Sequence, residues 1–595
     1  PLRLFLYPYV SGYIENYDGS WGYSANGGMD IKYGINDAFT LDATLIPDFG
    51  QVQFDNQVLN LSPFEVRFNE RRQFFTEGTE LFNKQGLFYS RRIGGIPENY
   101  GRAYSELDSN EVVEENPITT QLLNATKISG RTKRGTGIGL FNAITANEYA
   151  TLKDTLTGEP RDVLTGPISN YNVFVIDQNL KNNSTITLTN TNVMRSGETY
   201  DANVTALGTT LFTKGQKYSF NTSGSVSALF FTPDSNKIGH QFGLGLSKSA
   251  GQFRAGVNYN ESSKTYDKND LGFQRANNLR NVGGWLNYNT FTPKWRFLRT
   301  WSGANVNYQT LQENGAFTNF NFGFNFGGTF RNFMTAGVNM NVVPVRPRDY
   351  FEPRVQGRFY EGDQNVSFGC FWSSDYSKPF ALDGRLSYWR ANEIRRYGAG
   401  ANLEPRWRIN DKMMLIVESD VFYAQNVEGV ALGNGITFDP DNPDNPIFSK
   451  RDQWTVTNTI RYNLTFNNRM GITFRLRHYW ANVEYNEFFQ LNLDGQYEST
   501  TYTGFDDEGN SLHNNVFNAF TIDAVYRWVF APGSELSFVW KNSIFSSSGD
   551  VHLNYFQNVE TMAQNPATNS LSLKILYFID YWSVHQRLFK RNKID

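Results

Sequence analysis

Apolar and polar residues alternate along most of this chain, and the alternation restricts the folds that it can adopt. In the stretch GQFRAGVNYN, the apolar Phe253 and Val257 have the same parity as Tyr259, whereas Arg254 and Asn258 have the other. Successive side chains of a β-strand point to opposite faces, so each such stretch predicts a strand with one apolar and one polar face. The pattern recurs from end to end, and the chain is therefore predicted to be all-β.

Strand length and turn spacing distinguish membrane from soluble β-proteins. The predicted strands have about 10 to 14 residues, as a tilted strand needs to cross a bilayer, whereas soluble strands usually have about 5 or 6. Tight turns such as Arg134-Gly135 and Asn410-Asp411 alternate with longer connections, as in outer-membrane barrels. The longer connections are predicted near residues 148–169, 263–279, 426–450, 489–514 and 547–566. We predict a transmembrane antiparallel outer-membrane β-barrel; a soluble β-propeller is the alternative that the strand lengths disfavour.

Composition is consistent with this prediction. Aromatic residues make up 16% of the chain, with 49 Phe, 32 Tyr and 12 Trp, while the mean hydropathy is only -0.49. Aromatic girdles, a lipid-facing surface and a polar lumen explain both values. Lys and Arg total 55 against 58 Asp and Glu, so the net charge of -3 gives no long-range attraction for nucleic acid. No run approaches the ~18 consecutive apolar residues of a transmembrane helix.

The alternation of turns and loops also tests the number of strands. A count of about 25 strands breaks the alternation between residues 345 and 425. The weakest strand is RVQGRFYE, because three prolines in VPVRPRDYFEPRVQGRF oppose a β-ladder. When residues 344–363 form one outside loop, the count becomes about 24, within a range of roughly 22 to 26. Residues 1–595 are then one barrel in the cell outer membrane, with both termini on the periplasmic side.

Residues 47–121 interrupt the series of strands. A connection of this length without strands is unusual and is generally functional or disordered. Barrels of about 22 strands carry a plugged lumen rather than an open pore. We therefore predict that residues 47–121 form a plug-like insert folded into the lumen.

The insert contains a charged, phenylalanine-rich run, EVRFNERRQFFTEG, followed by SRRIG. Because arginine pairs with carboxylates through two parallel hydrogen bonds, the structural interpretation is a charge network inside the lumen. Its predicted members are Glu65, Arg67, Glu70, Arg71, Arg72, Glu77, Arg91 and Arg92, and the lumen wall would contribute Arg254, Arg475, Arg477, Asp523 and Arg527. The catalytic alternative assigns the glutamates as general acids or bases and the arginines as anion clamps.

The same region carries a family resemblance. The run TLDATLIPDFGQVQFDNQVLNLSPFEVRFNERRQFFTEG and the later LFYSRRIG, EPRVQGRF and SSDYSKPFAL are similar to a Bacteroidota outer-membrane family, domain of unknown function 5916. The resemblance spans essentially the whole chain. It implies a barrel that often follows a periplasmic domain resembling carbohydrate-binding module family nine, which this sequence lacks, and it implies no assigned chemistry.

Other candidate sites are weaker, and no cofactor or metal is predicted. The loop FDPDNPDNPIF offers Asp439, Asp441 and Asp444 as oxygen ligands for calcium, but it lacks the glycine and the terminal glutamate of a calcium-binding hand. The five histidines have no close metal-ligand spacing. The single cysteine, Cys370, is predicted to be a packed strand residue.

Three functions remain open at this point. The first is a non-enzymatic scaffold or accessory subunit of an outer-membrane complex for protein assembly, secretion or glycan uptake. The second is a plugged or gated substrate channel, for example for oligosaccharides. The third is an outer-membrane hydrolase. The expected partners are outer-membrane lipid, lipopolysaccharide and other outer-membrane or periplasmic proteins, and nucleic acid is not among them.

Overall fold

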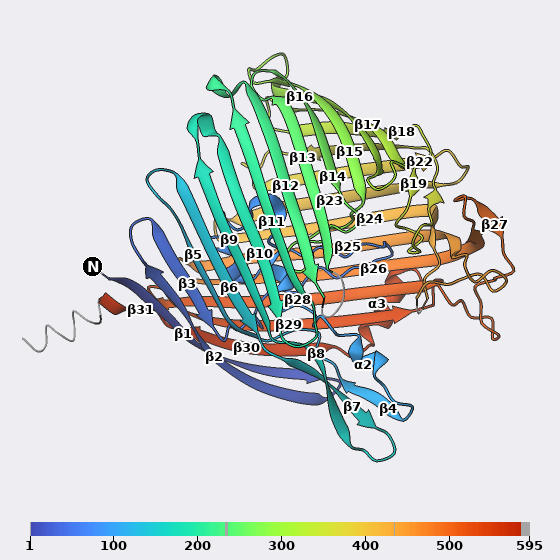
Figure 1. Cartoon of the computed structure of the whole chain (residues 1–595). Coiled ribbons are helices and arrows are strands. Elements are labelled where there is room, and N and C mark those ends of the chain that lie inside the picture. Colours follow the sequence, from blue (N-terminus) through green and yellow to red (C-terminus); the bar gives the residue numbers. More distant parts are fainter. Residues whose placement is uncertain (1, 232–235, 434, 583, 585–595) are drawn as a thin grey trace, which may run out of the picture.

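Residues 2–231, 236–433, 435–582 and 584 are described by the computed structural model of the chain. Their strands form an antiparallel sheet that closes on itself (Figure 1). The sheet has 26 strands; two of them are short segments beside the wall, and the other 24 form the barrel. The predicted all-β barrel and its number of strands are confirmed, and the soluble propeller is excluded.

The barrel strands differ in length from 7 to 22 residues. They are β1 (Arg3–Tyr17), β2 (Ser20–Gly34), β3 (Phe39–Leu45), β5 (Leu122–Arg131), β6 (Thr136–Thr145), β9 (Ser169–Asn179), β10 (Thr185–Arg195), β11 (Asp201–Phe212), β12 (Tyr218–Phe230), β13 (Lys237–Lys248), β14 (Phe253–Ser262), β15 (Leu279–Thr290), β16 (Phe297–Leu311), β17 (Phe317–Phe330), β18 (Thr335–Val343), β21 (Asn365–Ser373), β22 (Phe380–Ala391), β23 (Tyr397–Asn410), β24 (Met413–Val430), β25 (Ile447–Asn467), β26 (Met470–Leu491), β28 (Asn515–Ala531), β29 (Ser534–Ser548) and β30 (Thr568–Leu576).

The remaining elements lie in connections or at the chain end. They are the strands β4 (Glu111–Glu115), β7 (Glu148–Asp154), β8 (Pro160–Gly166), β19 (Arg348–Asp349), β20 (Tyr360–Glu361), β27 (Tyr497–Ser499) and β31 (Ile579–Asp580), the helices α1 (Gln73–Thr76), α2 (Arg102–Ser105) and α3 (Tyr555–Ala563), and the 3-10 turns η1 (Lys84–Gly86), η2 (Ser90–Arg92), η3 (Lys181–Asn183) and η4 (Lys214–Gln216). None of the helices in the described ranges has the length and apolar character needed to cross a membrane.

The wall closes where β1 meets β30. β1 pairs along its whole length with β2 on one side, and its residues Tyr9 to Tyr17 pair with β30 on the other, from Tyr9 opposite Leu576 to Tyr17 opposite Thr568. The first and last barrel strands are therefore neighbours.

Alternation along each strand separates an apolar outer face from a polar inner face. On β17, the outward residues Phe322, Phe324 and Phe326 are exposed, and the inward residues between them are Gly323 and Asn325. An outer surface of exposed Phe, Val and Leu side chains is stable in lipid and not in water. The wall is consequently the membrane-spanning part of the chain.

Tight turns and long connections occupy opposite ends of the barrel. Residues 411–412, 468–469 and 532–533 join their strands at one end, here called the short-turn end. Residues 344–364 connect β18 to β21 at the other, long-loop end and contain only the two-residue strands β19 and β20, as the predicted alternation required. β1 starts and β30 ends at the short-turn end. That this end is periplasmic stays a prediction.

The insert leaves and re-enters the wall between two neighbouring strands. β3 and β5 pair from Phe39 opposite Gly130 to Leu45 opposite Asn124. Just beyond this ladder, the Ile46 N–H donates to the Leu123 carbonyl at 2.9 Å. The whole insert therefore begins and ends at a single point of the long-loop end.

The last part of the insert does not lie against the lumen wall, contrary to the expectation for residues 47–121. β4 pairs with β7, and β7 pairs with β8, so the connection predicted as the loop 148–169 is a hairpin joined to the insert. Together with α2 these strands form a small lobe that projects from the barrel (Figure 1). Ala103, Ala150, Leu152 and Val163 are its buried core.

Helix α3 packs on the outer face of the wall. Its Tyr555 hydroxyl bonds with His478 Nδ1 at 2.9 Å and accepts from Asn458 Nδ2 at 2.8 Å. Asn558 donates to Asn518 Oδ1 at 2.7 Å. These wall residues belong to β25, β26 and β28, which have 21, 22 and 17 residues and extend the wall at the long-loop end.

Candidate functional site

The first part of the insert, residues 48–57, follows the inward face of five strands. We call it the strap. The Asp48 carboxylate accepts from Ser11 Oγ (2.5 Å) and from the Tyr13 hydroxyl (2.6 Å) on β1. Gln51 bonds Ser572 on β30 (3.1 Å) and Ser537 on β29 (2.8 Å), and the Phe54 N–H donates to Asp523 on β28 (3.1 Å). At the end of the strap, Asn56 and the Gln57 carbonyl accept from Arg475 (2.7 Å) and Arg477 (3.0 Å) on β26. Polar wall residues thus bind the strap without an apolar core.

Lysines of the wall satisfy carbonyl groups of the insert. Lys541 Nζ donates to the Val52 carbonyl at 2.8 Å, and Lys574 Nζ donates to the Asp48 carbonyl at 3.3 Å. Lys127 on β5 donates to the carbonyls of Phe74 (2.6 Å) and Glu77, at the end of helix α1. A cation is favourable at this position, because the last carbonyls of a helix lack intrahelical partners.

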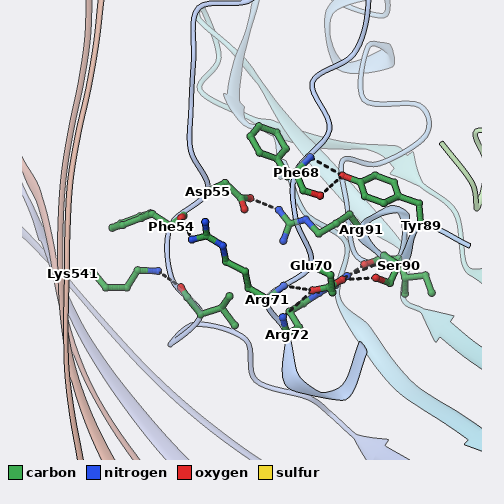
Figure 2. A network of polar contacts seen from close by, with 12 residues as sticks. Phe54, Asp55, Phe68, Glu70, Arg71, Arg72, Tyr89, Ser90, Arg91 and Lys541 are labelled. Atoms are coloured by element: carbon green, nitrogen blue, oxygen red, sulfur yellow. Dashed lines mark hydrogen bonds and ion pairs between the residues drawn. The ribbon is translucent and has the colours of Figure 1, made fainter. Parts of the chain in front are cut away.

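A buried pair, Glu70 with Arg72, lies at the centre of the charged run (Figure 2). Arg72 donates Nε to Oε1 at 2.9 Å and Nη2 to Oε2 at 2.7 Å, and Ser90 Oγ donates to Oε2 at 2.6 Å. The backbone N–H groups of Arg71 and Arg72 also donate to Oε1, at 3.0 and 2.8 Å. Arg72 has two further acceptors, the carbonyls of Ile93 and Ser90, both at 2.7 Å. The pair ties residues 70–72 to the turn at residues 90–93.

Aromatic and aliphatic side chains enclose this pair. The Arg72 guanidinium lies 4.3 Å from the ring centre of Phe75, a distance at which a cation is attracted to the ring face. Phe75 belongs to a buried cluster that includes Phe82 and Phe88 of the insert and Phe141 and Val173 of the wall. The insert therefore has an apolar core shared with β6 and β9.

The pKa of Glu70 is lowered from its ordinary value. Burial alone would raise it, but the hydrogen bonds and charge of Arg72 and the hydrogen bond from Ser90 outweigh that effect. A carboxylate held in the ionised form by a forked arginine is a poor proton donor near neutral pH. The arrangement suits a structural pair better than a general acid.

The remaining predicted insert residues make smaller contacts. Arg91 pairs with Asp55, and Arg92 binds both carboxylate oxygens of Glu65 at 2.9 and 2.7 Å. Arg71 Nη1 donates to the Phe54 carbonyl at 2.5 Å. Arg67 is exposed and lies 5.6 Å from the ring centres of Tyr89 and Phe273; Glu77, with a half-exposed side chain, lies 3.7 Å from Lys32 Nζ.

Three of the five predicted wall residues contact the insert, and two do not. Arg475, Arg477 and Asp523 bind the strap as described. Arg254 instead donates to the Gly251 carbonyl of its own turn at 3.2 Å, and Arg527 pairs with Glu535 of the neighbouring strand. Both lie towards the short-turn end, below the insert, so the expectation that they pair with it is wrong.

The opposite side of the lumen has a different chemistry, which the sequence analysis missed. We call the inward residues of β14 to β18 the asparagine wall. Its asparagines, by strand register, are Asn258, Asn260, Asn281, Asn287, Asn289, Asn305, Asn307, Asn319, Asn321, Asn325, Asn339 and Asn341. The sequence does contain a pattern that predicts this wall, the repeated Asn-x-Asn in NYN, NVN, NFN and NMN, because it places both asparagines on the same face of a strand.

Glycines make room for these amides on neighbouring strands. A Cβ atom on Gly323 would lie 2.3 Å from Asn305 Oδ1, so any other residue there would displace the Asn305 amide from its present position. Among the described inward residues of the asparagine wall, the charged side chains are Arg254 and Arg299, both near the short-turn end. Asn260, Asn305, Asn325 and Asn339 are exposed.

The insert does not cover the asparagine wall. Within the described ranges, no hydrogen bond or ion pair joins residues 47–121 to a strand from β12 to β24. Two loops between these strands do bind the insert at the long-loop end. The Tyr89 N–H donates to the Leu271 carbonyl at 2.6 Å, Arg92 Nε donates to the Gly272 carbonyl at 3.1 Å, and Arg354 Nη2 donates to the Leu61 carbonyl at 2.8 Å. A cavity of about 520 Å³ separates the two at the edge of the insert, with Lys84 and Gln85 on one side and Asn258, Asn260 and Trp285 on the other. The charged insert thus binds the barrel strands on one side of the lumen and only loops on the other side, where the neutral polar surface of the strands faces it.

The loop residues proposed for calcium have other partners. Asp439 is 2% exposed and accepts from the Thr500 hydroxyl, and Asp441 Oδ2 accepts from Thr501 Oγ1 at 2.8 Å. No group of three or more metal-ligating His, Cys, Asp or Glu side chains occurs in the part of the chain that is described. Cys370 pairs with Val338 and Leu386 and has their outward parity.

The fold and this lumen define a class, the transmembrane β-barrels of outer-membrane type with an insert bound to the inner wall. Within that class, the chain belongs to the family Domain of unknown function (DUF5916), whose model matches residues 1–588. The resemblance noted in the sequence is thereby confirmed. No curated protein matches the sequence.

Solved structures of outer-membrane proteins are similar only at a distance. The ferric yersiniabactin uptake receptor FyuA from Yersinia pestis is 8% identical, with a TM-score of 0.39 over 96% of this chain and 80% of that one. The FrpB iron transporter from Neisseria meningitidis is 10% identical, with a TM-score of 0.39 over 96% of this chain and 81% of that one. These likenesses add nothing to what the chain's own topology establishes.

Proposed function

We propose that the protein is a non-enzymatic channel of the outer membrane whose lumen is narrowed, but not sealed, by the insert. The observation that carries this proposal is that the insert binds barrel strands on one side of the lumen only. Its polar contacts with barrel strands reach β1, β2, β5, β9, β10, β26, β28, β29 and β30, whereas the asparagine wall carries exposed side chains. Water-accessible side chains inside a barrel are what a solute path requires.

The attachment also favours a fixed constriction over a plug that leaves the lumen. Separating the insert from the wall would expose the Phe75 cluster and break the strap contacts to Arg475, Arg477 and Asp523. Removing one partner from a buried ion pair alone costs about 3 to 5 kcal/mol. The insert therefore acts in this proposal as part of the channel wall.

Conductance in planar bilayers tests the proposal. The purified wild-type barrel is expected to conduct ions steadily. A variant in which residues 50–96 are replaced by a short Gly-Ser linker is expected to conduct several-fold more, because the lumen of a barrel with this many strands is wide once it is emptied. Heat-modifiable migration on gels controls for folding of the variant. A folded wild-type barrel that passes no current would refute the proposal.

A scaffold role in a larger outer-membrane complex is the second candidate, and the lobe favours it. The lobe and the adjoining insert segment expose large apolar side chains, with exposed fractions of 69% for Ile96, 54% for Tyr104, 64% for Ile118 and 77% for Leu156. Exposed apolar side chains grouped on one projection are typical of protein contact sites. Affinity purification from native membranes should recover defined envelope proteins with the full chain and lose them when residues 149–165 are replaced by a Gly-Ser turn. Equal recovery with both chains would remove the lobe as a docking element.

A further inference from the structure

We infer that the channel takes uncharged, hydroxyl-rich solutes of the oligosaccharide class, which bind along the asparagine wall. The inference rests on the proposed channel function and adds the class of solute. Three features carry it: the amide rows of the wall, the tryptophan rings set into them, and the cavity that separates them from Gln85 of the insert.

The amide rows match the hydrogen-bonding character of hydroxyl groups. A primary amide offers two donors and a carbonyl acceptor, and a sugar hydroxyl offers one donor and two acceptor positions, so either group can donate to the other. Asn305, Asn325 and Asn339 lie on β16, β17 and β18 and are exposed. Neighbouring strands are about 4.8 Å apart and alternate residues along a strand about 6.7 Å, so the amides form a grid that a chain of hydroxyls can follow.

The scarcity of charge on the wall decides against ionic solutes. A charged solute that leaves water needs a counter-charge or several dipoles aimed at it, and transferring an ion without them is costly. Arg254 and Arg299 are the charged side chains among the described inward positions of β14–β18, and both lie at the short-turn end. Along the remaining height of the wall, an anion or cation meets amides, hydroxyls, glycines and rings, and the aliphatic side chains of Leu279, Leu311 and Val343 at the long-loop end.

Tryptophan rings add apolar surfaces to the amide grid. Trp285 lies across Gly256, where a Cβ atom would be 2.7 Å from its indole nitrogen, and Trp301 lies in the same way across Gly327. Both indoles are inward by register and half-buried, so each ring covers a glycine with one side and leaves part of its surface to the lumen. A sugar ring presents C–H groups on its faces and hydroxyls at its edge, and an aromatic ring beside amides is complementary to both.

Gln85 of the insert borders the cavity on the side opposite the asparagine wall. Its backbone has a φ of 58°, an uncommon conformation for a residue other than glycine. Its Nε2 donates to the Thr187 carbonyl at 3.1 Å, but its Oε1 is buried without a hydrogen-bond partner among the described residues. Gln85 lines the cavity of about 520 Å³ opposite Asn258, Asn260 and Trp285. The Gln85 side chain therefore forms the insert side of the cavity that the amides and the indole of the asparagine wall line on the other side.

Current block in planar bilayers tests the inference on the full-length barrel. Maltohexaose, as a neutral probe, is expected to interrupt the potassium chloride current reversibly, whereas an oligogalacturonate of the same length is expected to block at least tenfold more weakly. The double variant N305A/N325A should weaken the maltohexaose block by roughly two- to tenfold for each amide removed. Trp285→Leu should also weaken it. Trp295→Leu, which removes an exposed tryptophan in the turn between β15 and β16, should leave the block unchanged.

The outcomes separate the inference from the channel proposal. A barrel that conducts but is blocked equally by both oligomers, or by neither, overturns the inference and leaves the channel proposal standing. A block by maltohexaose that N305A/N325A and Trp285→Leu do not change overturns the assignment to the asparagine wall. A folded barrel without conductance overturns both. Because Asn305 and Asn325 are exposed, their replacement by alanine is expected to leave folding intact, and heat-modifiable migration checks this.

Discussion

Replacing Glu70 by Gln tests whether buried charge pairing holds the insert against the wall. The substitution keeps the shape of the side chain but removes the charge that Arg72 binds through two hydrogen bonds. Arg72, whose side chain is 7% exposed, then stays buried without its counter-charge. Removing one partner of a buried pair costs about 3 to 5 kcal/mol. Because Arg72 keeps the carbonyls of Ile93 and Ser90 as acceptors, we expect the lower end, about 3 kcal/mol.

Hydrogen exchange measured by mass spectrometry reads this cost directly. Peptides covering residues 68–95 should exchange roughly a hundredfold faster in Glu70→Gln, since each 1.4 kcal/mol is a factor of about ten. Peptides from β14–β18 should not change, because the barrel wall is intact. Glu77→Gln is the matched control: the Glu77 side chain is 51% exposed and 3.7 Å from Lys32, and an exposed pair contributes about 0 to 1 kcal/mol.

Two results would refute the reasoning. One is equal acceleration in both variants, which would mean that burial of the pair does not matter. The other is acceleration of the wall peptides to the same extent as the insert peptides in Glu70→Gln, which would mean that the insert and the barrel open as one unit.

The remaining predictions concern pH, packing and orientation. The folded pKa of Glu70 lies below its unfolded value of 4.5, so its stabilising contribution is present above pH 4.5 and lost as the pH falls through the folded pKa; wild-type insert peptides should lose protection there, and Glu70→Gln should show no such step. Phe82→Ala removes a fully buried ring of the insert core and should cost about 3 to 5 kcal/mol, raising both exchange of the insert and conductance; unchanged exchange would place that core elsewhere. In a Cys370→Ser background, a membrane-impermeant maleimide on intact cells should label Glu313→Cys at the long-loop end and not Asn332→Cys at the short-turn end; the reverse pattern would place the termini outside.

Much of the wall was predictable because the alternation of apolar and polar residues in a strand assigns each residue to one of its two faces. The run NFNFGFNF specifies β17 and both of its faces, and the alternation of short and long connections corrected the strand count near residues 344–363. The alternation, however, gives only the face of the strand on which a residue lies, and not its height in the barrel or the residue with which it pairs. Arg254 and Arg527 have the inward parity expected of them and still lie away from the insert, beside Gly251 and Glu535.

Long-range pairing was the other limit. The segment EVVEE carries no mark of its partner strand, so its pairing with residues 151–154 could not be foreseen, and the lobe was taken for a loop. The charged run was a good guide to Glu70, Arg72, Arg91 and Arg92, which pair locally. It gave no hint that the neutral half of the lumen, marked by the repeated Asn-x-Asn pattern, would be the exposed one.

The pairing of β3 with β5 has a consequence for how this chain assembles and varies. Since these strands bond directly to each other, the insert is topologically no more than the loop of a hairpin, and the cylinder can complete every interstrand bond while the insert is still unfolded. Doubling the length of such a loop adds only about 0.6 kcal/mol of closure entropy. The contents of the lumen can therefore be exchanged in evolution, or in the laboratory, without a change of register anywhere in the barrel.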